Sequence, residues 1–185
     1  MFTEESFKNP WKAVASAVKY ENPWISVRED KVITPTGKEG IYGVVTFKNR
    51  AIGIVPIDNE GNIYLVGQWR YPLEEYSWEI PEGGGPMNEE PSITAARELK
   101  EETGLVANKI TLLGKIHTSN SVCNEVGYLF LATDLEQAES EPDETEIINI
   151  KKVPLSEAVR MVENAEITDS LAMAGILLAA RKYGI

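Results

Sequence analysis

One segment, residues 83–105, constrains this chain more than any other. It reads GGGPMNEEPSITAARELKEETGL, a glycine turn followed by acidic residues at helical spacing. Successive helical residues turn by about 100°, so three carboxylates share one face: Glu98, Glu101 and Glu102. The apolar residues expected on the opposite side are Ile93, Ala96 and Leu99. Because like charges at this spacing destabilise an isolated helix, the acidic face predicts a site for a divalent cation.

The sequence also predicts where this helix begins and ends. Pro91 suits the first helical turn, where its missing N–H leaves no hydrogen bond unmade, and Gly104 is a typical stop signal. We therefore expect a helix that begins at Pro91 and ends at Thr103.

The same segment follows a longer pattern. It contains glycine, five residues, glutamate, seven residues, and then Arg-Glu-apolar-x-Glu-Glu-x-Gly-apolar. The residues at the specified positions are Gly83, Glu89, Arg97, Glu98, Leu99, Glu101, Glu102, Gly104 and Leu105. This pattern resembles the complete signature of the Nudix hydrolases, a family that cleaves a nucleoside diphosphate linked to another moiety. The resemblance implies an α/β (α+β) fold, the Nudix fold, in which a mixed β-sheet lies between helices.

The resemblance also implies roles for the residues of the signature. The metal ligands would be the backbone carbonyl of Glu82 and the side chains of Glu98 and Glu102. Glu101 would be either a third ligand or a base, and Arg97 would hold a carboxylate in orientation. The implied cofactor is Mg²⁺, for which Mn²⁺ would substitute.

The run before the signature, QWRYPLEEYSWEIPEGGG (residues 68–85), narrows the resemblance. It is similar to the corresponding run of ADP-ribose and nucleoside diphosphate sugar pyrophosphatases. Arg70 is the expected contact to phosphate or sugar, because a guanidinium offers paired donors and does not titrate near neutral pH. The alternative is a surface arginine at the end of a strand.

A second acidic group, residues 139–146, precedes a later strand. Taken alone it reads as a solvated loop. In the ADP-ribose enzymes a glutamate of this loop closes over the metals and activates or orients the attacking water. Glu144 matches that position best when the following strand is aligned, and Glu146 is the second choice.

Substrate recognition is less clearly encoded. Trp24 and Tyr42 are candidates for stacking on a purine, although Trp24 suits the core of a small sheet or a dimer interface equally well. The loop 119–125 lacks the proline common in the ADP-ribose enzymes. Its Asn120 and Ser121 suit a hexose as well as a terminal ribose, so GDP-mannose competes with ADP-ribose as the expected substrate.

The rest of the chain divides at residue 48. Residues 1–48 hold three β-rich stretches and predict a small N-terminal antiparallel sheet. In the related sugar-nucleotide enzymes such a sheet commonly exchanges between subunits, which implies a homodimer. Residues 49–185 form the expected catalytic domain. Its further predicted elements are a hairpin of strands 51–58 and 62–69, strands 110–117, 127–134 and 144–153, helix 155–165, and helix 170–184 capped by Thr168 or Asp169.

Charge and composition limit the partners. A net charge of −11 argues against nucleic acid, whose backbone is bound by clustered Lys and Arg. An anionic substrate fits only if metal ions lie between its phosphates and the carboxylates. The chain has no apolar run of about 18 residues, no basic-then-apolar start and a single cysteine, Cys123, so we expect no membrane partner and a cytoplasmic location.

These observations predict Mg²⁺-dependent hydrolysis of the pyrophosphate bond of nucleoside diphosphate sugars, yielding a nucleoside monophosphate and a sugar phosphate. Two other classes stay open. A hydrolase that removes nucleoside triphosphates would keep the same signature, but the run at residues 68–85 disfavours it. A non-catalytic nucleotide-sensing Nudix module is disfavoured because none of the signature carboxylates is missing.

Overall fold

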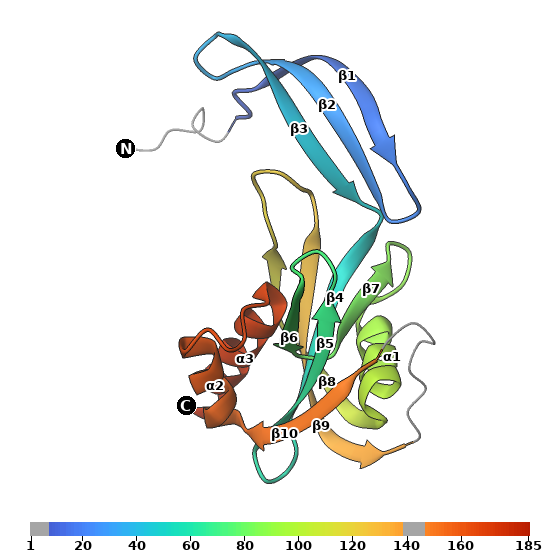
Figure 1. Cartoon of the computed structure of the whole chain (residues 1–185), viewed down its shortest axis with the longest axis vertical. Coiled ribbons are helices and arrows are strands. Elements are labelled where there is room, and N and C mark those ends of the chain that lie inside the picture. Colours follow the sequence, from blue (N-terminus) through green and yellow to red (C-terminus); the bar gives the residue numbers. More distant parts are fainter. Residues whose placement is uncertain (1–7, 139–146) are drawn as a thin grey trace. The chain divides into compact units, whose positions relative to one another are not determined.

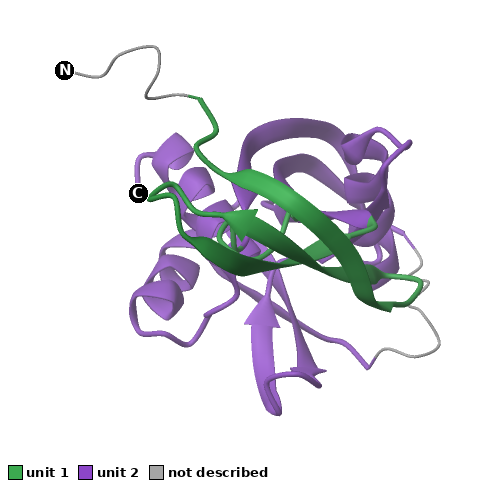
Figure 2. Ribbon diagram, turned by 90° about the horizontal axis from the view of Figure 1, so that it is seen from above, with its two compact units in different colours: residues 1–48, 119–125 green, residues 49–118, 126–185 purple. Residues whose placement is uncertain are grey.

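The computed structural model describes residues 8–138 and 147–185. These residues form two compact units, coloured separately in Figure 2. Unit 1 contains the described residues up to Lys48 together with Ser119–Glu125. Unit 2 contains Asn49–Thr118 and Val126–Ile185.

Unit 1 is built on an antiparallel sheet, in agreement with the sequence prediction. Its strands, in spatial order, are β1 (Lys12–Glu21), β2 (Ile25–Ile33) and β3 (Glu39–Phe47) (Figure 1). The side chain of Asn22 accepts two backbone N–H groups in the first connection. Gly37 has a φ of 84° in the second, a conformation that favours glycine.

The segment Ser119–Glu125 joins this sheet at the free edge of β3. The N–H of Val45 donates to the carbonyl of Val122 at 2.9 Å, and the N–H of Asn124 donates to the carbonyl of Val45 at 3.2 Å. The hydroxyl of Tyr42 donates to the carbonyl of Ser121 at 2.6 Å. We did not predict this pairing, because Tyr42 and Ser121 are 79 residues apart and local patterns do not reveal such contacts.

Unit 2 contains two sheets. The first has the spatial order β7 (Glu82–Pro86), β4 (Asn49–Pro56), β9 (Val126–Gln137) and β8 (Leu105–His117). It is mixed, because β4 and β9 are parallel and its other pairs are antiparallel. The second sheet is antiparallel, with the order β10 (Asn149–Pro154), β5 (Asn62–Arg70) and β6 (Glu75–Glu79).

Helices cover both sides of the mixed sheet (Figure 1). They are α1 (Pro91–Thr103) on one side, and α2 (Leu155–Glu163) and α3 (Ser170–Tyr183) on the other. Strand β4 shows how the core is divided, because its side chains alternate between the two faces. Ile52 and Ile54 pack in a cluster with Leu99 of α1, whereas Val55 packs in a cluster with Ile176 of α3. The predicted fold class is therefore confirmed.

The predicted hairpin of strands 51–58 and 62–69 is wrong. Both strands exist, but β4 and β5 lie in different sheets, and only an isolated bridge between Ile57 and Ile63 links them. The turn between them is tight, since the Asp58 side chain accepts the N–H of Asn62 at 2.9 Å. The sequence revealed this turn, but not that β6 and β10 occupy the edges of β5.

The helix ends follow the sequence closely. Helix α1 begins at Pro91, and Gly104 ends it with a left-handed φ of 67°. Helix α3 is capped by Asp169, whose side chain accepts the N–H of Ala172 at 2.7 Å, so Asp169 rather than Thr168 is the cap. None of the described helices has the length and apolar character needed to cross a bilayer.

Candidate active site

The acidic face of α1 is the face that packs inward. Glu98, Leu99 and Glu102 are all buried, whereas Ile93 is 58% exposed and Ala96 is exposed. The predicted burial of Ile93 and Ala96 is therefore wrong, whereas Leu99 is buried in the core as predicted. The reason lies outside the helix: the strand beside it, β7, is mostly glycine and leaves room for carboxylates.

The close approach of α1 to β7 depends on Gly83. A Cβ atom at this position would lie between 2.2 and 2.4 Å from the carboxyl atoms of Glu98, far inside van der Waals contact. The neighbouring Glu82 donates its backbone N–H to Oε2 of Glu102 at 3.0 Å. Strand β7 thus holds the Glu98 and Glu102 carboxylates one helical turn apart.

Arg97 pairs with two carboxylates of the same helix. Its guanidinium lies 2.8 Å from Glu98 Oε1 and 2.9 Å from Glu101 Oε2, and it also donates to the carbonyl of Gly84 at 3.4 Å. Burial lowers the pKa of Arg97, but the charges of Glu98 and Glu101 outweigh this effect and raise it. This geometry suits the predicted orienting role of Arg97.

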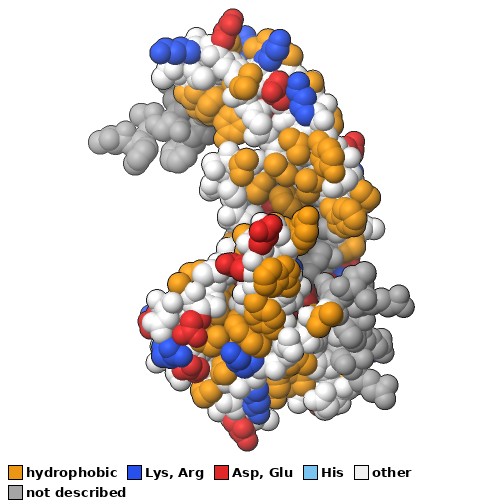
Figure 3. Space-filling model, in the orientation of Figure 1, with side chains coloured by type: hydrophobic (Ala, Val, Ile, Leu, Met, Phe, Trp, Pro, Cys, Tyr) orange, Lys and Arg blue, Asp and Glu red, His pale blue; other side chains and the backbone are white. Residues whose placement is uncertain are grey.

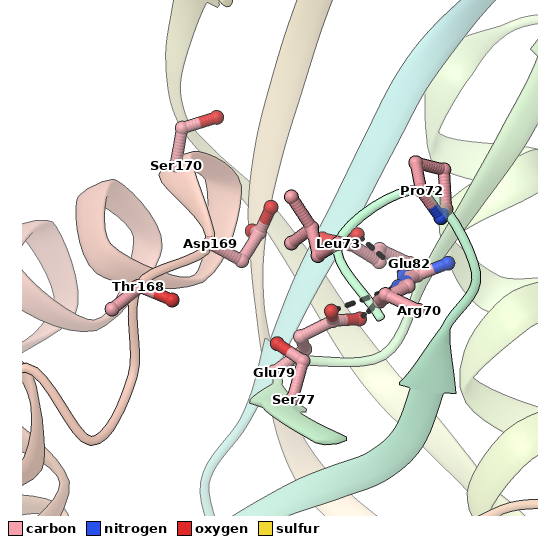
Figure 4. Close-up of a pocket in the computed structure, with 9 residues that line it drawn as sticks. All are labelled: Arg70, Pro72, Leu73, Ser77, Glu79, Glu82, Thr168, Asp169 and Ser170. Atoms are coloured by element: carbon pink, nitrogen blue, oxygen red, sulfur yellow. Dashed lines mark hydrogen bonds and ion pairs between the residues drawn. The ribbon is translucent and has the colours of Figure 1, made fainter. Parts of the chain in front are cut away.

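Arg70 lies in a second charged cluster, with Glu79 and Glu82 (Figure 4). Its guanidinium binds both carboxylate oxygens of Glu79 and lies 3.0 Å from Glu82 Oε1. Glu79 is only 2% exposed, so its charge depends on this pairing. The hydrogen bonds to Glu79 are the main reason why the pKa of Arg70 is raised. Our sequence reasoning did not assign Glu79 to the site, although it lies in the run that suggested Arg70.

Glu82 links the two clusters. Its backbone contacts Glu102, while its largely buried side chain contacts Arg70. Burial, followed by the nearby charges of Asp169 and Glu79, raises the pKa of Glu82 well above its usual range. Among the described residues, Glu82 Oε2 is the buried side-chain atom without a hydrogen-bond partner. A pocket of about 420 Å³ opens here, lined by Arg70, Pro72, Leu73, Ser77, Glu79, Glu82, Thr168, Asp169 and Ser170.

The donor atoms of this region fit a hard divalent cation. Glu98 and Glu102 offer carboxylate oxygens, and Glu82, whose backbone N–H binds Glu102, has an unpaired side-chain oxygen, Oε2. Within residues 8–138 and 147–185, no three acidic, histidine or cysteine side chains are already arranged as a metal cage. A cation would therefore compete with Arg97 for Glu98 and Glu101.

The other predicted site residues belong to unit 1 or lie outside the described residues. Trp24, which is 67% exposed, belongs to unit 1, as do Tyr42, Asn120 and Ser121. Tyr42 is engaged by other groups, since its ring packs edge-on against Trp11 at 5.2 Å and its hydroxyl binds Ser121. Glu144 and Glu146, the predicted candidates for the base, lie outside the described residues.

We expect Gly83→Ala to reduce kcat/KM about 10- to 100-fold, because the added methyl group displaces the Glu98 carboxylate. Steady-state kinetics and calorimetric titration of the metal would measure the effect. Gly43→Ala is the matched control, since it adds a methyl group to a strand glycine with no atom within 4 Å. Equal activity of the two variants would contradict the role of this contact.

The site consists of a helix that bears carboxylates and packs on a glycine-rich strand of a mixed sheet. This arrangement is typical of an α/β hydrolase that uses a cation to act on phosphates. The chain belongs to the Nudix hydrolases: the NUDIX domain family matches residues 47–173. A second family, the nucleoside diphosphate sugar hydrolase N-terminal domain, matches residues 5–45.

Similar proteins agree with this assignment. The chain is 35% identical to an ADP-ribose pyrophosphatase of Bacillus subtilis, covering 86% of each chain. It is 32% identical to an ADP-ribose pyrophosphatase of Mycobacterium tuberculosis, covering 92% of this chain and 83% of the relative. It is also 32% identical to a methanol dehydrogenase activator of Bacillus methanolicus, covering 79% and 80%. The fold matches the crystal structure of an ADP compounds hydrolase with a TM-score of 0.83 at 22% identity, covering 94% and 93%.

Proposed function

We propose that this Nudix hydrolase cleaves the pyrophosphate bond of nucleoside diphosphate sugars, with ADP-ribose as the first candidate substrate. The products are a nucleoside monophosphate and a sugar phosphate. The observation that carries the proposal is the packing of Glu98 and Glu102 against β7, next to a pocket that contains Arg70. The match of residues 5–45 to an N-terminal domain of nucleoside diphosphate sugar hydrolases supports the substrate class.

Each step of the proposed reaction is assigned to particular residues of this chain. A bound Mg²⁺, or Mn²⁺ in its place, neutralises the phosphate charge and lowers the pKa of a coordinated water. Glu98 and Glu102 would hold the cation, together with the backbone carbonyl of Glu82. Arg97 orients Glu98 and Glu101, and Glu101 is a third ligand or a base.

The attacking water also needs a proton acceptor. Glu144 removes this proton for in-line attack on phosphorus, and Glu146 is the alternative. Both assignments rest on the resemblance of the 139–146 segment to the corresponding loop of the ADP-ribose enzymes.

Arg70 contributes to substrate binding. Two of its donor groups bind Glu79, and its terminal nitrogen also meets Glu82, so the guanidinium is held at the pocket with a fixed orientation. A phosphate or sugar oxygen in the pocket would meet this fixed donor group. The loop residues Asn120 and Ser121, with Trp24 and Tyr42, remain our candidates for choosing between ADP-ribose and GDP-mannose.

We also propose a cytoplasmic homodimer that forms through unit 1. All ten residues of β1 are exposed, including the apolar Val14, Val18 and Tyr20. Figure 3 shows hydrophobic side chains gathered on the visible face of this sheet. An exposed apolar sheet of this kind is typical of a protein–protein interface, and a monomeric mass in analytical ultracentrifugation would rule the dimer out.

A substrate panel tests the proposed reaction. The panel contains ADP-ribose, GDP-mannose, ADP-glucose, NADH, diadenosine polyphosphates and deoxynucleoside triphosphates, with products identified by mass. We expect ADP-ribose to yield AMP and ribose 5-phosphate with Mg²⁺ or Mn²⁺, and EDTA to abolish the reaction. Preferential cleavage of triphosphates would favour the triphosphate hydrolase, and no turnover of any compound would favour a nucleotide-sensing module.

A further inference from the structure

We propose that the pocket at the N-terminus of α3 binds the terminal sugar of the substrate, and that Asp169 is a specificity-determining residue. This inference rests on the proposed function and adds a sugar-binding role for residues outside the Nudix signature. The pocket lies between the β5–β6 region and the start of α3, and Figure 4 shows its lining side chains. Its volume of about 420 Å³ is within the range of small-molecule sites and leaves room for a pentose or hexose.

The charge of the pocket favours a neutral ligand with hydroxyl groups. Three carboxylates, Glu79, Glu82 and Asp169, line it together with one guanidinium, Arg70. Arg70 neutralises Glu79, whereas Asp169 has no cationic partner in this lining. An ionised carboxylate such as that of Asp169 accepts hydrogen bonds, and each sugar hydroxyl donates one, so a sugar complements this side chain.

The pocket is also lined by residues with hydroxyl groups, Ser77, Thr168 and Ser170. Ser77 is only 7% exposed, and no hydrogen bond among the described residues uses its side chain. Thr168 and Ser170, at the other wall, are exposed residues whose hydroxyls also make no hydrogen bond within that part of the chain. Buried polar groups are normally hydrogen-bonded. Among the described residues, the buried side-chain atom without a partner is Glu82 Oε2, which belongs to the lining of this pocket and therefore indicates a polar ligand. Hydroxyls both donate and accept, as sugar hydroxyls do.

One carboxylate oxygen of Asp169 accepts a hydrogen bond from the helix, and the other is available to a ligand in the pocket. Its Oδ2 caps α3 by accepting the N–H of Ala172 at 2.7 Å. Figure 4 shows its side chain directed from the start of α3 towards Leu73 and Glu82. Because the cap fixes the carboxylate, the second oxygen is presented to a ligand at little entropic cost.

The position of the pocket suits the sugar end of the substrate. Glu82 lines the pocket with its side chain and binds Glu102 through its backbone N–H. A sugar held against Glu82 therefore lies beside the carboxylates that would hold the cation and the reacting phosphates.

Asp169→Ser tests this assignment. Serine keeps the helix cap but removes the second oxygen from the pocket. We expect kcat/KM for ADP-ribose to fall about 10- to 100-fold, chiefly through KM, because a hydrogen bond to a charged group is lost. The comparison substrate is the methyl ester of ADP, which has the same pyrophosphate but no terminal sugar, and its kcat/KM should change less than about twofold. Glu157→Ser, on the neighbouring α2 and outside the pocket, controls for the change in net charge.

Equal losses for ADP-ribose and the methyl ester would overturn the proposal, because a disturbed fold or a disturbed cation site affects both substrates alike. If the wild-type protein hydrolyses neither compound, the proposed reaction fails, and calorimetric binding of ribose 5-phosphate decides the role of the pocket. Binding at least about tenfold weaker in Asp169→Ser than in Glu157→Ser would support it. Equal binding by the two variants would overturn it.

Discussion

Glu102→Gln should lower kcat about 100- to 1,000-fold while the fold persists, because one cation ligand is lost from the catalytic helix. Glu102 is buried and accepts the N–H of Glu82 at 3.0 Å. The amide oxygen of glutamine still accepts that hydrogen bond, so the packing of α1 against β7 is kept. The amide carries no charge and binds a hard cation poorly, so metal affinity falls together with turnover.

Steady-state kinetics over a range of Mg²⁺ concentrations would measure this loss, and circular dichroism would check the fold. The matched control is Glu90→Gln, since Glu90 is exposed, precedes the same helix and makes no capping hydrogen bond. Glu144→Gln, made in parallel, separates loss of the proposed base from loss of a ligand, because it should lower kcat without weakening metal binding. Near-normal turnover of Glu102→Gln with Mg²⁺ would remove this helix from the mechanism.

Arg70→Met should destabilise the protein by about 3–5 kcal/mol, the largest stability effect that we expect, because it leaves the charge of Glu79 buried without its partner. Glu79 is 2% exposed and both of its oxygens bind the Arg70 guanidinium. Methionine keeps much of the aliphatic volume of arginine, so the loss reports mainly on the charge. Activity should fall as well, since the guanidinium lines the pocket that we propose for the substrate.

Urea denaturation would measure the change in the free energy of unfolding. The double variant Arg70→Met with Glu79→Gln should recover part of the stability, because the buried charge is then removed with its partner. Arg160→Met is the control, since Arg160 forms an exposed ion pair with Glu157 and should matter far less. A similar small effect at Arg70 and Arg160 would show that Glu79 does not depend on its pairing.

Local sequence signals predicted the elements of the fold well. Pro91 and Gly104 marked the two ends of α1, and Asp169 was one of two predicted caps of α3. The three N-terminal strands were also predicted, because turn residues separate β-rich stretches there. Each of these features depends on a few neighbouring residues and on backbone preferences that tertiary contacts did not override.

Long-range relations were predicted poorly. Strands β4 and β5 were expected to pair as a hairpin, but they lie in different sheets, because the partners of each strand come from distant parts of the chain. The pairing of Arg70 with Glu79 was missed for a related reason. In the antiparallel register of β5 and β6, Arg70 lies opposite Glu75 and Glu79 lies opposite Val66, so strand pairing alone does not predict the hydrogen bond between the Arg70 and Glu79 side chains.

The sequence by itself determined the carboxylate helix, its ends and the hydrolase family, because helical spacing and the Nudix signature are local properties of one segment. Only the tertiary structure decided which face of that helix is buried. Residue type favoured Ile93 and Ala96, but the Glu98 carboxylate packs inward because Gly83 of β7 has no side chain where the two elements meet. The tertiary structure also brought Arg70, Glu79, Glu82 and Asp169 to one pocket, because strand pairing and helix packing join residues that local patterns treat as independent.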